Sequence, residues 1–265
     1  MPHYQAVSQA AHAHLRWQRA SHYVFAAHDA VAALAAQEAP TAAVSLPLAF
    51  VPDAEGVTLV ALQGLAPGRN LLVGSDGRWQ AAYVPAVYRA YPFHLGTLED
   101  GQSVLCVDAD SGLLSADGAV GEAFFAQDQP SPALQQVLQL VQGLAEQRPR
   151  TVRICAHLQA LELLEPWPIT LRTEQGDQMV PGLLRVSEAR LNALSAQALK
   201  EAQQSGALLL AYCQLLSMQH LARLGELARQ QMTAAAPAQS LPTNARGELD
   251  LEFLHQSGTL NFGGL

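Results

Sequence analysis

Residues 46–65, LPLAFVPDAEGVTLVALQGL, carry the pattern that decides the predicted fold. Two apolar runs, residues 46–51 and 57–65, lie on either side of a short segment that contains Pro, Asp and Gly. Apolar runs bounded by turn residues are typical of β-strands. Because parallel strands need a long crossover, a connection this short predicts that the two strands pair antiparallel.

Strand-like patterns continue along the chain. Residues 70–73, 80–87 and 103–107 are further strand candidates, and the sequence GSDG at 74–77 predicts a tight turn. Since the connections between these candidates are short, we expect a mainly antiparallel sheet over about residues 46–108.

Helical periodicity follows this segment. Ser131 and Pro132 are typical of a helix start, with Ser as the N-cap and Pro in the first helical position. Apolar side chains then recur at spacings of three and four residues, which predicts an amphipathic helix. They belong to Leu134, Val137, Leu138, Val141, Leu144 and Ala145. We expect Pro149 to end this helix, because proline interrupts a helix interior.

Extended segments and further helices are predicted in the C-terminal half. Residues 169–173 and 178–186 look extended, and a helix is expected from Ser187 to Gly206, a residue type that often ends helices. Residues 207–230 predict a longer helix whose first two turns are apolar all round, so we expect those turns at the centre of a core. The predicted fold class is α+β, with the antiparallel sheet packed against helices from the C-terminal half.

Composition divides the chain into three predicted parts. Residues 1–45 are an alanine-rich N-terminal arm or helix, residues 46–230 the α+β domain, and residues 231–265 a linker with an apolar C-terminal tail. Leu and Phe alternate with acidic residues in part of the tail, which leaves open whether the tail docks on its own domain or on a partner.

Composition also limits the classes of function. The chain has 265 residues, of which 49% are hydrophobic and 14% are charged, and its net charge is −8. This apolar content suffices for a sizeable core, and the low charge indicates a surface that a partner partly covers. Nucleic-acid binding needs a basic surface that displaces counterions, so the acidic balance argues against it.

Three features predict a cytoplasmic protein. Residues 1–19 lack the apolar segment of a signal peptide. The longest apolar run, residues 207–213, is far shorter than the roughly 20 residues of a membrane-spanning helix. Cys106, Cys155 and Cys213 are widely spaced and odd in number, which favours reduced thiols over disulfides or a CxxC metal site.

Two stretches resemble a known protein family. Residues 70–93 read NLLVGSDGRWQAAYVPAVYRAYPF, and residues 206–221 read GALLLAYCQLLSMQHL. The order of GRW at 77–79, YVP at 83–85 and RAYPF at 89–93 resembles the signature of the SapC family of bacterial proteins.

This resemblance extends over roughly residues 14–230 and implies a protein without an assigned activity. Family members are linked to surface-layer formation and are often labelled peptide transporter permeases, but the missing membrane span argues against a permease here. The family offers no catalytic residues that could be transferred to this chain.

An aromatic block lies within the first of these stretches. Trp79, Tyr83, Tyr91 and Phe93 would share one face of an uninterrupted strand, and Arg89 lies among them. These residues are the predicted binding site, an aromatic surface with Arg89 as a clamp for an anion or carboxylate. The alternative is a structural core in which Arg89 satisfies buried carbonyl and hydroxyl groups.

No catalytic residues are predicted, and neither a cofactor nor a metal site is expected. The sequence contains no G-x-S-x-G, G-x-G-x-x-G or Walker motif. The two Asp of the segment 108–110 are interpreted as turn residues rather than as a cation site. Four N-terminal histidines keep a metal site open as an alternative to a solvated, alanine-rich arm. They are His12, His14, His22 and His28.

The sequence therefore predicts a non-catalytic accessory or adaptor protein that binds a protein or peptide partner. Low charge, missing catalytic motifs and the apolar tail favour this hypothesis. The alternatives are a metal-dependent enzyme that acts on a small molecule or peptide, and a surface-layer-associated protein. A homo-oligomer stays open, whereas no nucleic-acid partner and no transmembrane segment are expected.

Overall fold

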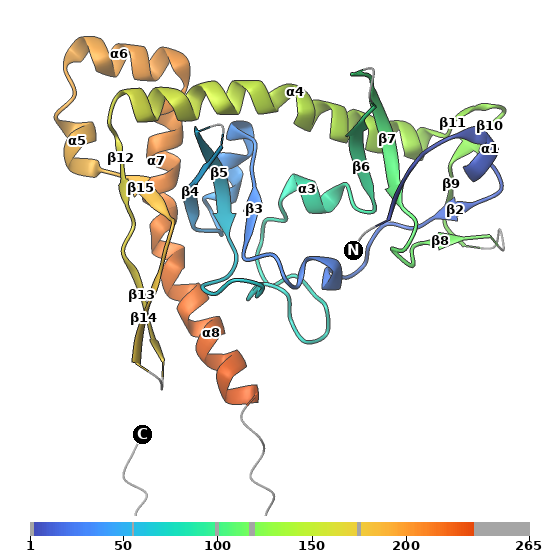
Figure 1. The fold of residues 1–265 in the computed structure, drawn as a ribbon, viewed down its shortest axis with the longest axis horizontal. Helices are drawn as coiled ribbons and strands as arrows, with labels where there is room; N and C mark the ends of the chain where they lie inside the picture. The colour runs from blue at the N-terminus through green and yellow to red at the C-terminus, as the bar shows by residue number, and fades with distance from the viewer. Residues whose placement is uncertain (1–2, 55, 99–100, 117–119, 174–175, 236–265) are drawn as a thin grey trace, which may run out of the picture. The chain divides into compact units, whose positions relative to one another are not determined.

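The computed structural model describes residues 3–54, 56–98, 101–116, 120–173 and 176–235. It shows a mixed α+β protein with antiparallel sheets and several helices, which confirms the predicted fold class (Figure 1). The chain divides into two compact units, residues 1–228 and 229–265, and the architecture below is that of the first. Of the second unit, the structure describes the helical end at residues 229–235.

The larger sheet has five strands in the order β12-β15-β4-β5-β3, and each neighbouring pair is antiparallel. The strands are β3 (Val31–Ala33), β4 (Leu48–Asp53), β5 (Gly56–Leu62), β12 (Leu164–Pro166) and β15 (Leu184–Val186). β4 and β5 pair from Leu48↔Ala61 to Asp53↔Gly56, which confirms the antiparallel pair predicted from residues 46–65.

A second sheet has three strands in the order β1-β7-β6. The strands are β1 (Tyr4–Ala6), β6 (Phe93–Thr97) and β7 (Ser103–Asp108), and both neighbouring pairs are antiparallel. The strands within residues 46–108 therefore belong to two sheets rather than to one continuous meander.

The segment between β5 and β6 differs from the prediction. A strand at residues 80–87 is wrong, because these residues form bends and the start of helix α3 (Ala86–Arg89). Pro85 directly precedes α3; its missing N–H removes a donor that a strand would need and suits a helix start. The GSDG turn is confirmed, since the N–H of Gly77 donates to the carbonyl of Gly74 at 2.9 Å.

Short elements complete the described part of the chain. A further sheet has the order β8-β2-β9, with β8 (Leu114–Ser115), β2 (Arg16–Trp17) and β9 (Glu122–Ala123). Two strand pairs are separate from it. One joins β10 (Phe125–Ala126) to β11 (Gln129–Pro130), and the other joins β13 (Ile169–Thr173) to β14 (Gly176–Val180). The short helices are α1 (Gln9–His12), α2 (Ala39–Ala42) and the 3-10 turns η1 (Val24–Ala26), η2 (Ala36–Glu38) and η3 (Met218–His220).

Helix α4 (Pro132–Ala160) runs across both sheets (Figure 1). Its predicted start is confirmed, because the Ser131 hydroxyl accepts the N–H of Leu134 at 3.2 Å. The predicted end at Pro149 is wrong, since the helix continues for a further three turns. The first half of α4 packs in the core of the smaller sheet and the second half in the core of the larger sheet. Burial at both ends offsets the hydrogen bond that a proline in the interior removes.

The C-terminal helices are α5 (Glu188–Asn192), α6 (Ala196–Ser205), α7 (Ala207–Ser217) and α8 (Leu221–Ala235). The single helix predicted between Ser187 and Gly206 is interrupted, and Ser195 caps α6 by accepting the N–H of Ala198 at 3.2 Å. Gly206 ends α6 as predicted, with a φ of 87° that suits glycine.

Helix α7 is not buried all round, so the expectation for its first two turns is wrong. Its buried face packs in the core of the larger sheet, whereas Leu209, Tyr212 and Leu216 retain exposed fractions of 60%, 48% and 67%. The larger sheet covers only one face of the helix, and uniform hydrophobicity in the sequence does not reveal how many neighbours a helix has.

Two predictions concern the ends of the chain. Residues 1–45 were expected as an arm or helix, and their described part, residues 3–45, contributes β1, β2, β3 and short helical turns to the first unit. The apolar tail lies outside the described residues, and the division of the chain into three parts stays a prediction. No helix in the described part of the chain is long and apolar enough to cross a membrane.

Candidate functional site

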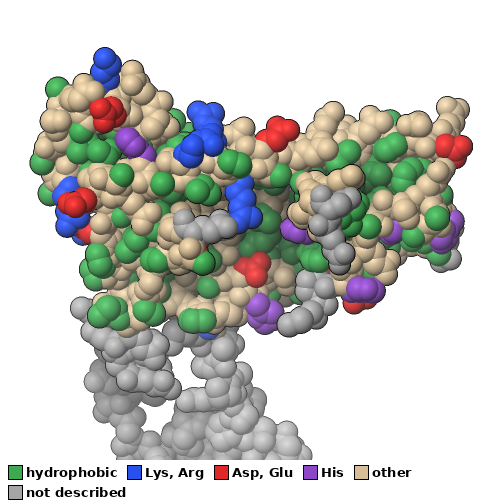
Figure 2. All heavy atoms as spheres, turned by 45° about the horizontal axis from the view of Figure 1, so that its top comes forward, with side chains coloured by type: hydrophobic (Ala, Val, Ile, Leu, Met, Phe, Trp, Pro, Cys, Tyr) green, Lys and Arg blue, Asp and Glu red, His purple; other side chains and the backbone are tan. Residues whose placement is uncertain are grey.

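A cleft of about 500 Å³ lies beneath α4 and is lined by strands of both sheets. This volume is within the range of small-ligand sites. Its walls come from strands β3, β4, β5, β6 and β7 and from helices α3 and α4. Figure 2 shows hydrophobic side chains at the floor of the hollow and charged side chains at its rim. We call this feature the α4 cleft.

One stripe of α4 forms a wall of the α4 cleft. Val141, Leu144, Arg148, Thr151 and Val152 line the cleft and recur at spacings of three and four residues, which places them on one helix face. The stripe changes from apolar to polar along the helix. Sequence reasoning missed Thr151 and Val152 because the helix was expected to end at Pro149.

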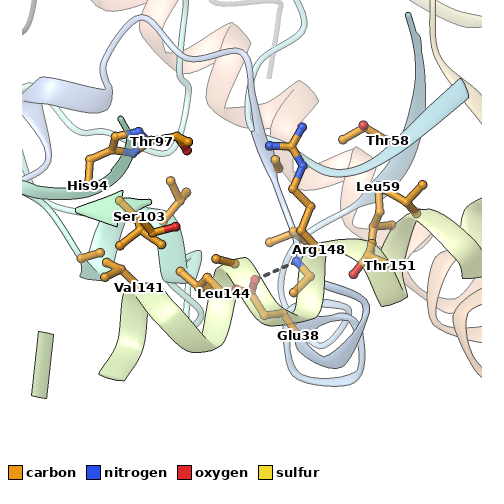
Figure 3. Close-up of a pocket in the computed structure, with 18 of the residues that line it drawn as sticks. Glu38, Thr58, Leu59, His94, Thr97, Ser103, Val141, Leu144, Arg148 and Thr151 are labelled. Atoms are coloured by element: carbon orange, nitrogen blue, oxygen red, sulfur yellow. Dashed lines mark hydrogen bonds between the residues drawn. The ribbon is translucent and has the colours of Figure 1, made fainter. Parts of the chain in front are cut away.

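The polar side chains of the α4 cleft lie on opposite sides. Figure 3 places His94, Thr97 and Ser103 on one side and Thr58 on the other, with Arg148 between them. An imidazole, a guanidinium and the carboxylate of Asp53 thus border a mainly apolar space. A guanidinium presents several N–H donors in a plane that matches a carboxylate, so this arrangement suits a ligand with both an apolar and an anionic group.

Glu38 is a buried carboxylate in the wall of the cleft, with an exposed fraction of only 7%. It accepts hydrogen bonds from the N–H of Ala35 at 2.9 Å, the hydroxyl of Tyr83 at 2.6 Å and the N–H of Ala86 at 2.9 Å. These bonds join η2 to the start of α3 and compensate the burial of the charge. The residue three positions before Glu38 is Ala35 rather than Ser or Thr, so the capping-box signature is incomplete and no local sequence signal identifies Glu38.

Three of the predicted binding residues lie close together. The indole N–H of Trp79 donates to the carbonyl of Tyr83 at 2.8 Å, and the guanidinium of Arg89 lies 5.7 Å from the centre of the Tyr83 ring. Burial and the hydrogen bond to Glu38 raise the pKa of Tyr83 above its usual value. Arg89 is exposed, whereas Trp79 and Tyr83 are half-buried.

The other two predicted binding residues lie elsewhere. Tyr91 stacks on Phe25 with 3.8 Å between ring centres and donates its hydroxyl to Asp108 at 3.1 Å. Phe93 is buried in the core of the smaller sheet, 4.8 Å from Trp17 between ring centres, and it also lines the α4 cleft. The structure therefore distributes the predicted set over three environments, and the binding role of these residues stays a prediction.

The N-terminal histidines also occupy different environments. His12 is buried, with its Nδ1 3.3 Å from the backbone carbonyl oxygen of Ser8 and its ring 5.1 Å from that of Phe124. His28 is exposed and approaches the carbonyl of Gly68 at 3.1 Å through Nδ1. Among the residues that the structure describes, no three His, Cys, Asp or Glu side chains are grouped to hold a metal ion.

A second cavity of about 630 Å³ lies beside α7 and is lined by Glu165, Arg185 and Tyr212 among others. Glu165 and Arg185 form an ion pair at 3.0 Å, and hydrogen bonds from Ser187 and Arg185 lower the pKa of Glu165. Because Glu165 and Arg185 satisfy each other's charge, this ion pair offers a ligand little net charge.

The fold and the cleft define a mixed α+β protein in which a long helix connects two antiparallel sheets over a partly apolar site. The model of the SapC family matches residues 7–224, which is most of the chain. The chain belongs to the SapC family, as the motifs in residues 70–93 and 206–221 indicate. Searches of curated proteins and of solved structures found no match.

Proposed function

We propose that this protein is a non-catalytic accessory protein that binds a peptide segment of a partner in the α4 cleft. An apolar side chain of the partner occupies the floor beside Val141 and Leu144, and an acidic group lies near Arg148 and His94. The observation that carries this proposal is the combination of Arg148 and His94 with a mainly apolar floor in one cleft.

Asp53 and Glu38 line the cleft together with Arg148 and His94, and the basic side chains favour a partner that includes an acidic group. The carboxylate of Glu38 is already engaged by three donors, so it offers little to a basic ligand. A guanidinium has several N–H donors, so Arg148 can bond to a partner's carboxylate in addition to the interaction that it already makes. Partner peptides should therefore combine an apolar residue with Asp, Glu or a terminal carboxylate.

A reducing compartment such as the cytoplasm is the proposed location. Cys106, Cys155 and Cys213 are all free thiols, and the latter two are buried. Burial raises the pKa of Cys155 to about 11 and also raises the pKa of Cys213, which keeps both in the unreactive thiol form.

A substitution that fills the α4 cleft tests the proposed function. Ala145 is exposed on α4 and lines the cleft, so Ala145→Trp should block it without disturbing a core. Random octapeptides displayed on phage are selected for binding to the natural protein. The affinity of the enriched peptides is then measured by fluorescence anisotropy. We expect enrichment of apolar–acidic sequences and at least a tenfold loss of affinity in Ala145→Trp.

The matched control is Gln139→Trp, which adds the same side chain to an exposed position of α4 outside the cleft. This variant should bind the enriched peptides as the natural protein does. Either an absence of enrichment or equal binding by Ala145→Trp would contradict the proposed function.

A further inference from the structure

Among the strands that the structure describes, β6 is an edge of the smaller sheet, because it pairs with β7 alone in the order β1-β7-β6. Its register with β7 is continuous from Phe93↔Val107 to Thr97↔Ser103. Phe93, His94, Leu95 and Thr97 all line the α4 cleft. The open edge of a β-sheet therefore lies along the candidate binding site.

The hydrogen bonds at the two ends of β6 determine which backbone groups are directed to the open side. The N–H of Asp108 donates to the carbonyl of Pro92, and the N–H of Leu98 donates to that of Gln102, both at 2.9 Å. In an antiparallel ladder, hydrogen-bonded pairs alternate with pairs whose N–H and C=O groups point outward. The N–H and C=O groups of Leu95 and Thr97 are consequently directed away from β7.

The opposite side of β7 supports this assignment. The carbonyl of Leu105, which faces Leu95 in the register, accepts the N–H of Val7 from the β1 side at 2.8 Å. Odd-numbered residues of β7 thus bond to β1, which leaves their β6 partners free to bond on the open edge.

The β6 edge lacks three features that often prevent strand addition. Natural edge strands are protected by Lys, Pro or a bulge. The sequence of β6, FHLGT, contains neither Lys nor Pro, and its register shows no bulge. In β-strand addition, backbone hydrogen bonds to a sheet edge give affinity, and pockets for alternate side chains give specificity. The β6 edge offers the backbone groups, and the partly apolar cleft beside it offers space for side chains.

We propose that the open edge of β6 accepts an extended segment of a partner protein as an additional β-strand. This inference rests on the proposed function and specifies how the cleft holds its ligand. Leu95 and Thr97 present two N–H and two C=O groups about 7 Å apart along the strand, which suits a segment of roughly three to five residues. Alternate side chains of that segment face the apolar stripe of α4, while acidic neighbours lie near His94 and Arg148.

A proline at position 97 tests directly whether the backbone of β6 forms hydrogen bonds with the bound peptide. Thr97→Pro removes an outward N–H, and the ladder to β7 does not use that donor. The matched control, Thr97→Val, keeps the N–H and a side chain of the same shape. For octapeptides selected on the natural protein, we expect about a tenfold loss of affinity in Thr97→Pro and less than a twofold change in Thr97→Val.

Two further measurements keep the test independent of the folding of the proline variant. N-methylation of the bound peptide should abolish binding only at alternate residues, because only those would donate to β6. In the natural protein, amide hydrogen exchange at Leu95 and Thr97 should slow on addition of the peptide.

The outcomes separate this inference from the proposed function. If Ala145→Trp blocks the peptides but Thr97→Pro and N-methylation leave binding unchanged, the cleft binds side chains and the β6 inference is overturned. If no peptide is enriched, the proposed function fails and the inference fails with it. A dimer of the natural protein that Thr97→Pro converts to a monomer would place a second copy on the edge and would also overturn the inference.

Discussion

At the scale of single residues, Glu38 connects the cleft wall to the rest of the fold. Its Oε2 accepts the N–H of Ala35, and its Oε1 accepts both the Tyr83 hydroxyl and the Ala86 N–H. A buried group with this many donors cannot be replaced by a neutral one without leaving a donor unsatisfied. Glu38 is therefore expected to position η2 and α3 rather than to react with a ligand.

Glu38→Gln tests this structural role. The amide oxygen can still accept bonds from Tyr83 and Ala86, but the amide nitrogen then faces the N–H of Ala35. We expect a loss of about 1–3 kcal/mol in the free energy of unfolding, measured by urea denaturation. Tyr83→Phe removes one donor and leaves the carboxylate in place, so it should cost less. A loss in Glu38→Gln no larger than in Tyr83→Phe would argue against this role.

At the scale of elements, α4 shows what could be predicted from sequence. Ser131 and Pro132 predicted its start correctly, because a cap is a local interaction between neighbouring residues. The continuation of α4 beyond Pro149 was not predictable, because the burial of Ile154 and Leu158 against the larger sheet depends on residues distant in sequence. That error also concealed Thr151 and Val152 as residues of the cleft.

Pro149→Ala measures the cost of a proline inside α4. The substitution restores an N–H to an exposed position of the helix, so we expect an increase of about 1–3 kcal/mol in the free energy of unfolding. Pro132→Ala is the matched control at the first helical position, where proline is favourable, and it should give no increase. A decrease in Pro149→Ala would mean that the proline sets a bend by which α4 contacts both cores.

At the scale of the whole molecule, local patterns predicted the class of fold but not how its strands are divided among separate sheets. The β4–β5 pair follows from two adjacent apolar runs, whereas the pairing of β1 with β7 joins residues about a hundred positions apart. The aromatic block shows the same limit. Trp79 and Phe93 would share a face on one continuous strand, but Pro85 and α3 interrupt that segment. The Trp79 ring therefore packs against the core of the larger sheet, and the Phe93 ring packs in the core of the smaller sheet.

Burial of weak acids throughout the molecule gives a prediction for alkaline pH. Burial raises the pKa of Cys155 to about 11, and burial together with the Asp108 carboxylate raises that of Tyr91 to about 12. The pKa values of Tyr83 and Tyr88 are also raised, chiefly by burial. The folded protein thus retains protons that the unfolded chain releases near its ordinary values of 9 for Cys and 10 for Tyr.

The sign of the effect follows from this difference in protonation. Below about pH 9 these groups are neutral in both states, so their contribution to stability is complete and constant. As pH rises from 9 through 12, the unfolded chain loses protons first, and the free energy of unfolding must fall. Urea denaturation at pH 8, 9, 10 and 11 measures this fall, and Tyr91→Phe should make it less steep. A free energy of unfolding that stayed constant up to pH 11 would contradict the burial of these groups, because an exposed thiol or phenol ionises equally in both states.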